Sequence, residues 1–240
     1  MNEVSIKALR EATPVKSYAS GPFSVVICRF LSPIISIPAI KWKISPNTIT
    51  ILMVLSGLLG GILFSIPNIY IKALSVPIYI LWFIFDCSDG EVARFTGKFS
   101  KYGKQLDWMA HLTCHPLYII GLWSTFFQYR TDCFLLITII CFVLLSLELI
   151  NRTLVSINDL FVKENNKTEE RSDKPKGLIN YIKNQLYWFP NQVLLFPLLF
   201  LTDIISDTPF FIYIFISWSL LYSIYVLKRF VVLIIIMYKS

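Results

Sequence analysis

Residues 69–111 decide the fold, and they read IYIKALSVPIYILWFIFDCSDGEVARFTGKFSKYGKQLDWMAH. The first seventeen of these residues are apolar or small, apart from Lys72 and a few hydroxyl groups. Three carboxylates follow, Asp86, Asp89 and Asp107, where one apolar segment ends and the next begins. Carboxylates beside hydrocarbon are costly unless something binds them, and a divalent cation is a suitable binder. The stretch therefore predicts a cation site at the edge of a membrane.

The composition of the whole chain is that of a membrane protein. Of 240 residues, 55% are hydrophobic and 15% are charged, and the mean hydropathy is +0.64. Several windows reach the roughly 18 residues with few charges that are needed to cross about 30 Å of hydrocarbon. Six windows are predicted transmembrane helices: 47–65, 69–90, 105–127, 133–157, 186–205 and 209–227. We therefore expect an all-α polytopic membrane protein with six transmembrane helices.

Residues 22–40 are also apolar, but they are less suited to crossing the membrane. Arg29 lies in the middle of this segment, where a charge costs roughly 2.5–3.5 kcal/mol, and two prolines interrupt it. We interpret the segment as an amphipathic helix along the membrane interface, with a seventh span as the alternative. The chain is then one membrane domain, with these parts: a cytosolic or interfacial segment at 1–44 and a six-helix bundle at 45–240, which includes a cytosolic loop at 158–185.

The basic residues predict how the chain is oriented. Lys and Arg exceed Asp and Glu by 22 to 15, which gives a net charge of +7. They gather before the first span, in residues 91–104, in the loop at 158–185 and after the sixth span, whereas the opposite turns hold only Lys72 and Arg130. By the positive-inside rule, both termini and the acidic stretch face the cytosol. We expect a bacterial inner membrane, and the same rule explains the basic pI without a nucleic-acid partner.

Several reactive residues are predicted to be structural. Glu91 is expected to be a solvated residue near a helix end. His115 is expected to be a packed histidine bonded to a neighbour, with a His-x3-His metal pair as the alternative. The cysteines show no metal or disulfide spacing and are expected to be reduced, and they are Cys28, Cys87, Cys114, Cys133 and Cys141.

The spacing of the polar residues places them on two helix faces. Asp86 and Asp89 are three residues apart, so both face the same way on a helix. A stripe of residues four apart follows on the next predicted helix: Gly103, Asp107, His111 and His115. If the two helices pack as a hairpin, these faces converge on one pocket that opens to the cytosol. Carboxylates that face a basic loop suit a metal–polyphosphate ligand.

The order Asp-x2-Asp-Gly-x2-Ala-Arg-x8-Gly-x3-Asp-x3 resembles the signature of the CDP-alcohol phosphatidyltransferase family. Residues 86–107 match every position of it, and the segment Ser45-Pro46-Asn47-Thr48-Ile49-Thr50 and the six-span plan are also similar to the family. The resemblance implies transfer of a substituted phosphate from CDP-diacylglycerol or a CDP-linked small alcohol to a hydroxyl acceptor, with release of CMP. The acceptor would be a lipid, a small alcohol or a glycan precursor, in phospholipid or surface-glycoconjugate synthesis.

The resemblance also implies roles for individual residues. Mg²⁺, Mn²⁺ or another divalent cation would be bound by Asp86, Asp89, Asp107 and His111. The nucleotide and diphosphate would be bound by Gly90, Ala93, Arg94 and Gly103. Membrane lipids and a second copy of the chain would be partners.

One position departs from the family pattern. The last motif position is normally a fourth aspartate that acts as the general base, and here it is His111. Imidazole titrates near neutral pH, so His111 is predicted to be the catalytic base. One negative charge is lost, which favours a cation that accepts nitrogen, such as Mn²⁺ or Zn²⁺.

Polar residues in a later span are candidates for acceptor binding, and they are Glu148, Asn151 and Arg152. Ionisable groups inside a span are functional candidates, and a structural hydrogen bond between helices is the alternative for Glu148. Two other functions stay open, which are a degenerate family member acting as a scaffold and a divalent-cation transporter. A transporter needs polar groups in both membrane halves, whereas this chain concentrates them at the cytosolic end.

Overall fold

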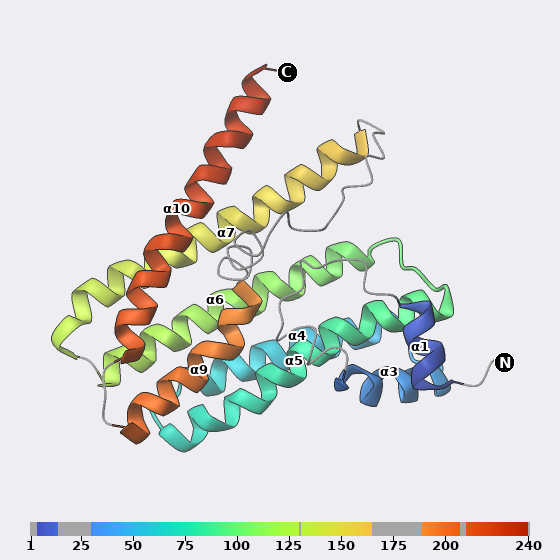
Figure 1. The fold of residues 1–240 in the computed structure, drawn as a ribbon, viewed down its shortest axis with the longest axis horizontal. Coiled ribbons are helices and arrows are strands. Elements are labelled where there is room, and N and C mark those ends of the chain that lie inside the picture. The colour runs from blue at the N-terminus through green and yellow to red at the C-terminus, as the bar shows by residue number, and fades with distance from the viewer. Residues whose placement is uncertain (1–3, 14–29, 130, 165–188, 207–209, 240) are drawn as a thin grey trace.

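A computed structural model of the chain describes residues 4–13, 30–129, 131–164, 189–206 and 210–239, and all regular structure in these ranges is helical (Figure 1). Four helices are long and apolar enough to cross a membrane: α4 (Pro46–Ser65), α5 (Ile69–Thr96), most of α7 (Phe134–Glu164) and α10 (Phe210–Lys239). The all-α membrane class is therefore confirmed. The other two predicted spans coincide with α6 (Gly103–Tyr129) and α9 (Phe189–Ser206), which do not meet that criterion, so the count of six stays a prediction.

The helices that carry the acidic stretch form the centre of the protein. α4 packs along both α5 and α6, α7 packs on α6, and α10 packs on α7. Asn68 caps the start of α5, because its side chain accepts from the N–H groups of Tyr70 and Ile71. The helix ends at Gly97, whose φ of 66° lies in the left-handed region that glycine tolerates best. α5 and α6 therefore do not pack along each other as the predicted hairpin: both pack on α4, and their side chains meet at the carboxylates.

Three glycines let α4 and α6 approach closely. A Cβ atom on Gly61 would lie 2.6 Å from Cβ of Leu117, and one on Gly57 would lie 3.0 Å from Cβ of Cys114. On α6, a Cβ atom on Gly121 would overlap the ring of Phe64. This close contact fixes how α6 is rotated against α4, and so it fixes the direction in which the polar stripe of α6 faces.

The N-terminal part differs from the prediction of one amphipathic interfacial helix over 22–40. Residues 30–41 contain α3 (Ser32–Lys41), residues 22–29 lie outside the described residues, and an unpredicted helix, α1 (Ile6–Ala12), lies beside α3 at the end of α5 (Figure 1). α3 is not amphipathic in the expected sense, because its polar Ser32 and Ser36 face the protein and the apolar Ile34 is 65% exposed. The serines are turned inward by a buried partner, which is described below.

Several predicted boundaries and one class of residue need correction. α7 continues to Glu164, so residues 158–164 are helical rather than part of the predicted loop, and 165–185 lie outside the described residues. α10 continues beyond residue 227 to Lys239. Cys114 and Cys141 carry free thiols, but Cys87 forms a disulfide bond, so the expectation of reduced cysteines is wrong at Cys87.

Candidate functional site

The polar faces of α5 and α6 meet at a cluster of two carboxylates and an imidazole. One ligand atom from each of Asp86, Asp107 and His111 lies within 4.8 Å of the other two. Nε2 of His111 is 3.5 Å from Oδ1 of Asp86 and 3.6 Å from Oδ1 of Asp107. Two carboxylate oxygens and a neutral imidazole nitrogen are suitable donors for a divalent cation. The residues present therefore fit the cation that the sequence predicts.

Asp89 lies apart from this cluster. Its Oδ2 accepts a hydrogen bond of 2.7 Å from Oγ1 of Thr50 on α4, and it lines the neighbouring pocket. Asp86 and Asp89 are on one side of α5, as the spacing predicts, but only Asp86 is in the three-residue cluster. The structure thus brings together three of the four predicted ligands and places the fourth beside them.

An open pocket of about 330 Å³ adjoins the cluster. All four residues predicted to bind the nucleotide line it, together with Asp89 and Asp107: Gly90, Ala93, Arg94 and Gly103. A Cβ atom on Gly90 would lie 3.0 Å from the Arg94 guanidinium. The absence of a side chain at Gly90 therefore leaves room for the Arg94 side chain. Pro46, Asn47 and Thr50 form another wall, which explains why the predicted motif segment 45–50 belongs to the site.

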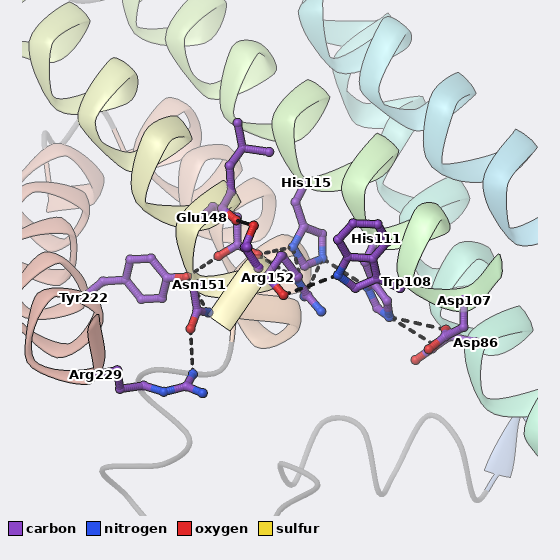
Figure 2. A network of polar contacts seen from close by, with 12 residues as sticks. Asp86, Asp107, Trp108, His111, His115, Glu148, Asn151, Arg152, Tyr222 and Arg229 are labelled. Atoms are coloured by element: carbon purple, nitrogen blue, oxygen red, sulfur yellow. Dashed lines mark hydrogen bonds and ion pairs between the residues drawn. The ribbon is translucent and has the colours of Figure 1, made fainter. Parts of the chain in front are cut away.

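A chain of polar contacts runs from the cluster into the bundle (Figure 2). Nδ1 of His111 is 3.4 Å from Nε2 of His115, and Nδ1 of His115 is 2.6 Å from Oε1 of Glu148 on α7. Nε of Arg152 donates to the same Oε1 over 2.9 Å, and the Tyr222 hydroxyl of α10 donates to Oε2. His115 is fully buried and Glu148 is 1% exposed. His115 is therefore a packed histidine bonded to its neighbours, as expected.

The chain of contacts continues to α10 through the other predicted acceptor residue. Asn151 donates from Nδ2 to the Tyr222 hydroxyl over 3.1 Å and accepts from Arg229 over 2.6 Å (Figure 2). Nε1 of Trp108 donates to the carbonyl oxygen of Arg152, which ties α7 to the cluster end of α6. Sequence reasoning missed Tyr222 and Arg229, although two polar residues seven apart share one face of a helix and could have indicated an inward side.

Glu91 is not the solvated residue that we expected. It is 5% exposed, and its Oε1 accepts from Arg10 over 2.6 Å and from Ser32 over 2.9 Å. Its Oε2 accepts from Ser36 over 2.6 Å. α5 continues to Thr96, so Glu91 lies inside the helix, on the side covered by α1 and α3. A buried carboxylate needs such donors, and this is why the serines of α3 face inward.

Comparison with known proteins agrees with the motif. A family model described as CDP-alcohol phosphatidyltransferase matches residues 43–205, more than half of the chain. The matched range includes every residue of the cluster, the pocket and the α7 part of the polar chain, and it excludes α1, α3 and α10. No curated protein matches the chain.

Proposed function

Because the chain belongs to the CDP-alcohol phosphatidyltransferase family, whose members transfer a phosphate-linked group from a CDP-alcohol in lipid synthesis, we propose that it moves a substituted phosphate to a hydroxyl acceptor and releases CMP. The observation that carries this proposal is the acidic cluster beside an open pocket that Arg94 and Lys104 also line. Carboxylates and basic side chains around one cavity are what a cation–diphosphate ligand requires.

The donor would lie in the pocket with its diphosphate near the cluster. Arg94 can bind phosphate oxygens through its planar guanidinium, and Lys104 offers a second positive charge. Gly90, Ala93 and Gly103 are small, so the backbone and the donor can approach closely. CDP-diacylglycerol and a CDP-linked small alcohol are the two candidate donors, and the experiment below separates them.

The family generally depends on a divalent metal, and the cluster supplies donors for one. We propose that Asp86, Asp107 and His111 hold Mg²⁺ or Mn²⁺, and that Asp89 takes part from the adjoining wall. When bound, such a cation neutralises phosphate oxygens and makes the phosphorus easier to attack.

His111 is proposed to be the residue that handles the acceptor's proton. The acceptor oxygen attacks the β-phosphorus, the bond to CMP breaks, and the proton of the acceptor hydroxyl must pass to a base. Nδ1 of His111 faces His115, so Nε2 is the nitrogen that faces the cluster. One lone pair on Nε2 serves either proposed role, as a base or as a cation ligand, but not both at the same moment.

The acceptor is proposed to bind between α6 and α7. The Arg152 side chain is 17% exposed and lies on the cluster side of α7, so it can meet an anionic or hydroxyl-bearing acceptor. Asn151 supports this region from the same helix turn. Glu148 already accepts hydrogen bonds from three protein groups, so we propose that it acts through its neighbours rather than on the acceptor.

The setting in the cell is also a proposal. The distribution of Lys and Arg supports cytosolic termini and a cytosolic site, in a bacterial inner membrane with lipid neighbours. A homodimer is proposed from the family resemblance.

The test is to incubate the purified protein with Mg²⁺ or Mn²⁺ and a panel of CDP-alcohols, each with lipid and small-alcohol acceptors, and to follow CMP release. The expected result is CMP release with one donor class, loss of release with EDTA, and a new phosphodiester found by mass spectrometry. Nucleotide binding without CMP release from any pair would instead support a scaffold. Cation flux into proteoliposomes without nucleotide would support a transporter.

A further inference from the structure

The two nitrogens of the His111 ring face different partners, carboxylates on one side and a second imidazole on the other. Nε2 faces the oxygens of Asp86 and Asp107, at 3.5 and 3.6 Å, whereas Nδ1 faces a second ring, that of His115. The indole of Trp82 packs edge-on against the His111 ring at 5.3 Å between centroids and 86° between planes. A nitrogen lone pair that faces two carboxylates is repelled by them unless a positive charge lies between. This geometry is favourable when a cation occupies that space.

The hydrogen bonds behind His111 decide which of its nitrogens carries the proton. An ionised carboxylate only accepts, so the short contact of 2.6 Å requires that Nδ1 of His115 donates to Glu148. A neutral imidazole has one N–H, so Nε2 of His115 is left as an acceptor. Nδ1 of His111 must then donate to it, and in the neutral ring the lone pair of His111 is therefore on Nε2.

Arg152 does not compete for the nitrogen of His115 that donates to Glu148. One of its terminal nitrogens is 3.0 Å from Nδ1 and 3.3 Å from Nε2 of His115. An atom almost equally close to both ring nitrogens lies over the ring face, not in line with either lone pair. Nε of Arg152 binds Glu148 instead, which keeps that carboxylate ionised and in place.

We propose that Glu148 and His115 are positioning residues that fix His111 in the tautomer with its proton on Nδ1, so that Nε2 binds the cation held by Asp86 and Asp107. This inference rests on the proposed function for the identity of the site. It assigns His111 the role of ligand in place of the role of base. Carboxylates and imidazoles behind a metal-binding histidine orient it and strengthen its bond to the metal. The resulting oxygen and nitrogen donors favour Mn²⁺ over Mg²⁺.

The test is a Mn²⁺ titration of the purified full-length protein in lipid nanodiscs without nucleotide, with free Mn²⁺ measured by electron paramagnetic resonance. Glu148→Gln is expected to lower the affinity by about 10–100-fold, the usual cost of losing such a partner. The amide can donate to His115 and so reverse the direction of the hydrogen bonds. In the His111→Asp background the same change should cost less than about twofold, because an aspartate has no tautomer to fix.

A matched control uses the other buried glutamate of the described residues near the site. Glu91→Gln makes the same exchange of atoms in a side chain that binds Arg10 and two serines instead of a histidine, and the Mn²⁺ affinity should stay within about twofold of wild type. If Glu148→Gln costs the same factor with His111 and with Asp at that position, Glu148 is merely structural and the inference is wrong.

A spectroscopic measurement on the wild-type protein does not depend on any variant folding. Electron spin echo modulation from a directly bound ¹⁴N is expected in the wild-type Mn²⁺ complex and is expected to be absent in His111→Asp. Lack of nitrogen coupling in wild type, or lack of Mn²⁺ binding, overturns the inference. CMP release is assayed separately, so an enzyme that is active without nitrogen coupling refutes this inference alone. Nitrogen coupling without CMP release from any donor refutes only the proposed function.

Discussion

Two carboxylates from neighbouring helices share a narrow space with one imidazole, although like charges at that distance repel. Asp86 and Asp107 come from α5 and α6, and their oxygens lie within 4.8 Å of each other and of a His111 nitrogen. Such repulsion is tolerated where the residues bind a ligand, because both carboxylates are attracted to a bound cation and the net interaction becomes favourable. At the scale of the residue, each member of the cluster should therefore matter for cation-dependent activity.

Asp86→Asn tests the cluster with the smallest change of shape. The variant loses one charged donor, and kcat/KM for CMP release should fall by about 10²–10³-fold, because a bound cation is worth several kcal/mol of charge stabilisation. Asp132→Asn is the matched control, since Asp132 lies in the short helix η1 (Thr131–Cys133) between α6 and α7, away from the cluster. Equal activity of Asp86→Asn and wild type would remove this cluster from the mechanism.

At the scale of the helix, Glu91 connects α5 to the two N-terminal helices. Glu91→Ala leaves Ser32 and Ser36 without their acceptor and Arg10 without its partner. Losing the acceptor of buried donors costs about 1–3 kcal/mol, so the hydrogen-exchange protection of α1 and α3 amides should fall by about 5–150-fold. The measurement is exchange followed by mass spectrometry.

The control for Glu91 is Glu11→Ala on α1, since Glu11 is exposed. Its protection pattern should match wild type. If α1 and α3 keep their protection in Glu91→Ala, the contacts of Leu9 and the other apolar residues hold these helices without the glutamate.

α4 and α6 can approach closely because the glycines in their contact carry no side chains. Gly61→Ala places a methyl group 2.6 Å from Cβ of Leu117, and this backbone-proximal atom cannot move away without shifting a helix. Overpacking of this kind costs about 1–3 kcal/mol, so the unfolding temperature should fall by several degrees. Leu59→Ala on the same helix is the control, because Leu59 is 49% exposed on the outer face and should have little effect. A Gly61→Ala protein as stable as wild type would show that the helices can separate freely.

At the scale of the whole molecule, the loop between α5 and α6 and the turn between α6 and α7 lie at opposite ends of α6. By the positive-inside rule, we expect the first of these to lie in the cytosol. In a background without native cysteines, Asp132→Cys should react with a membrane-impermeant maleimide in intact cells. Lys98→Cys should react only after permeabilisation. Labelling of Lys98→Cys in intact cells would contradict this orientation and show that the site faces away from the cytosol.

The sequence by itself determined the helical membrane class, the approximate positions of the long helices and much of the site. Apolar length predicts helices in lipid, and spacing within one helix predicts which residues share its face, because both depend only on local backbone geometry. The stripe of Asp107, His111 and His115 on α6 was predicted on this basis. Gly90, Ala93, Arg94 and Gly103 were assigned from the family resemblance instead, and the structure shows that they line one pocket.

Only the tertiary structure decided how these faces meet. Packing at the glycines sets the rotation of α6 against α4, and the positions of α5 and α7 around it bring Asp86 to His111 and Glu148 to His115. Asp89 binds Thr50 and Glu91 binds Arg10 for the same reason, since both partners are distant in sequence. Such contacts depend on how whole helices fit together, and no local pattern specifies that.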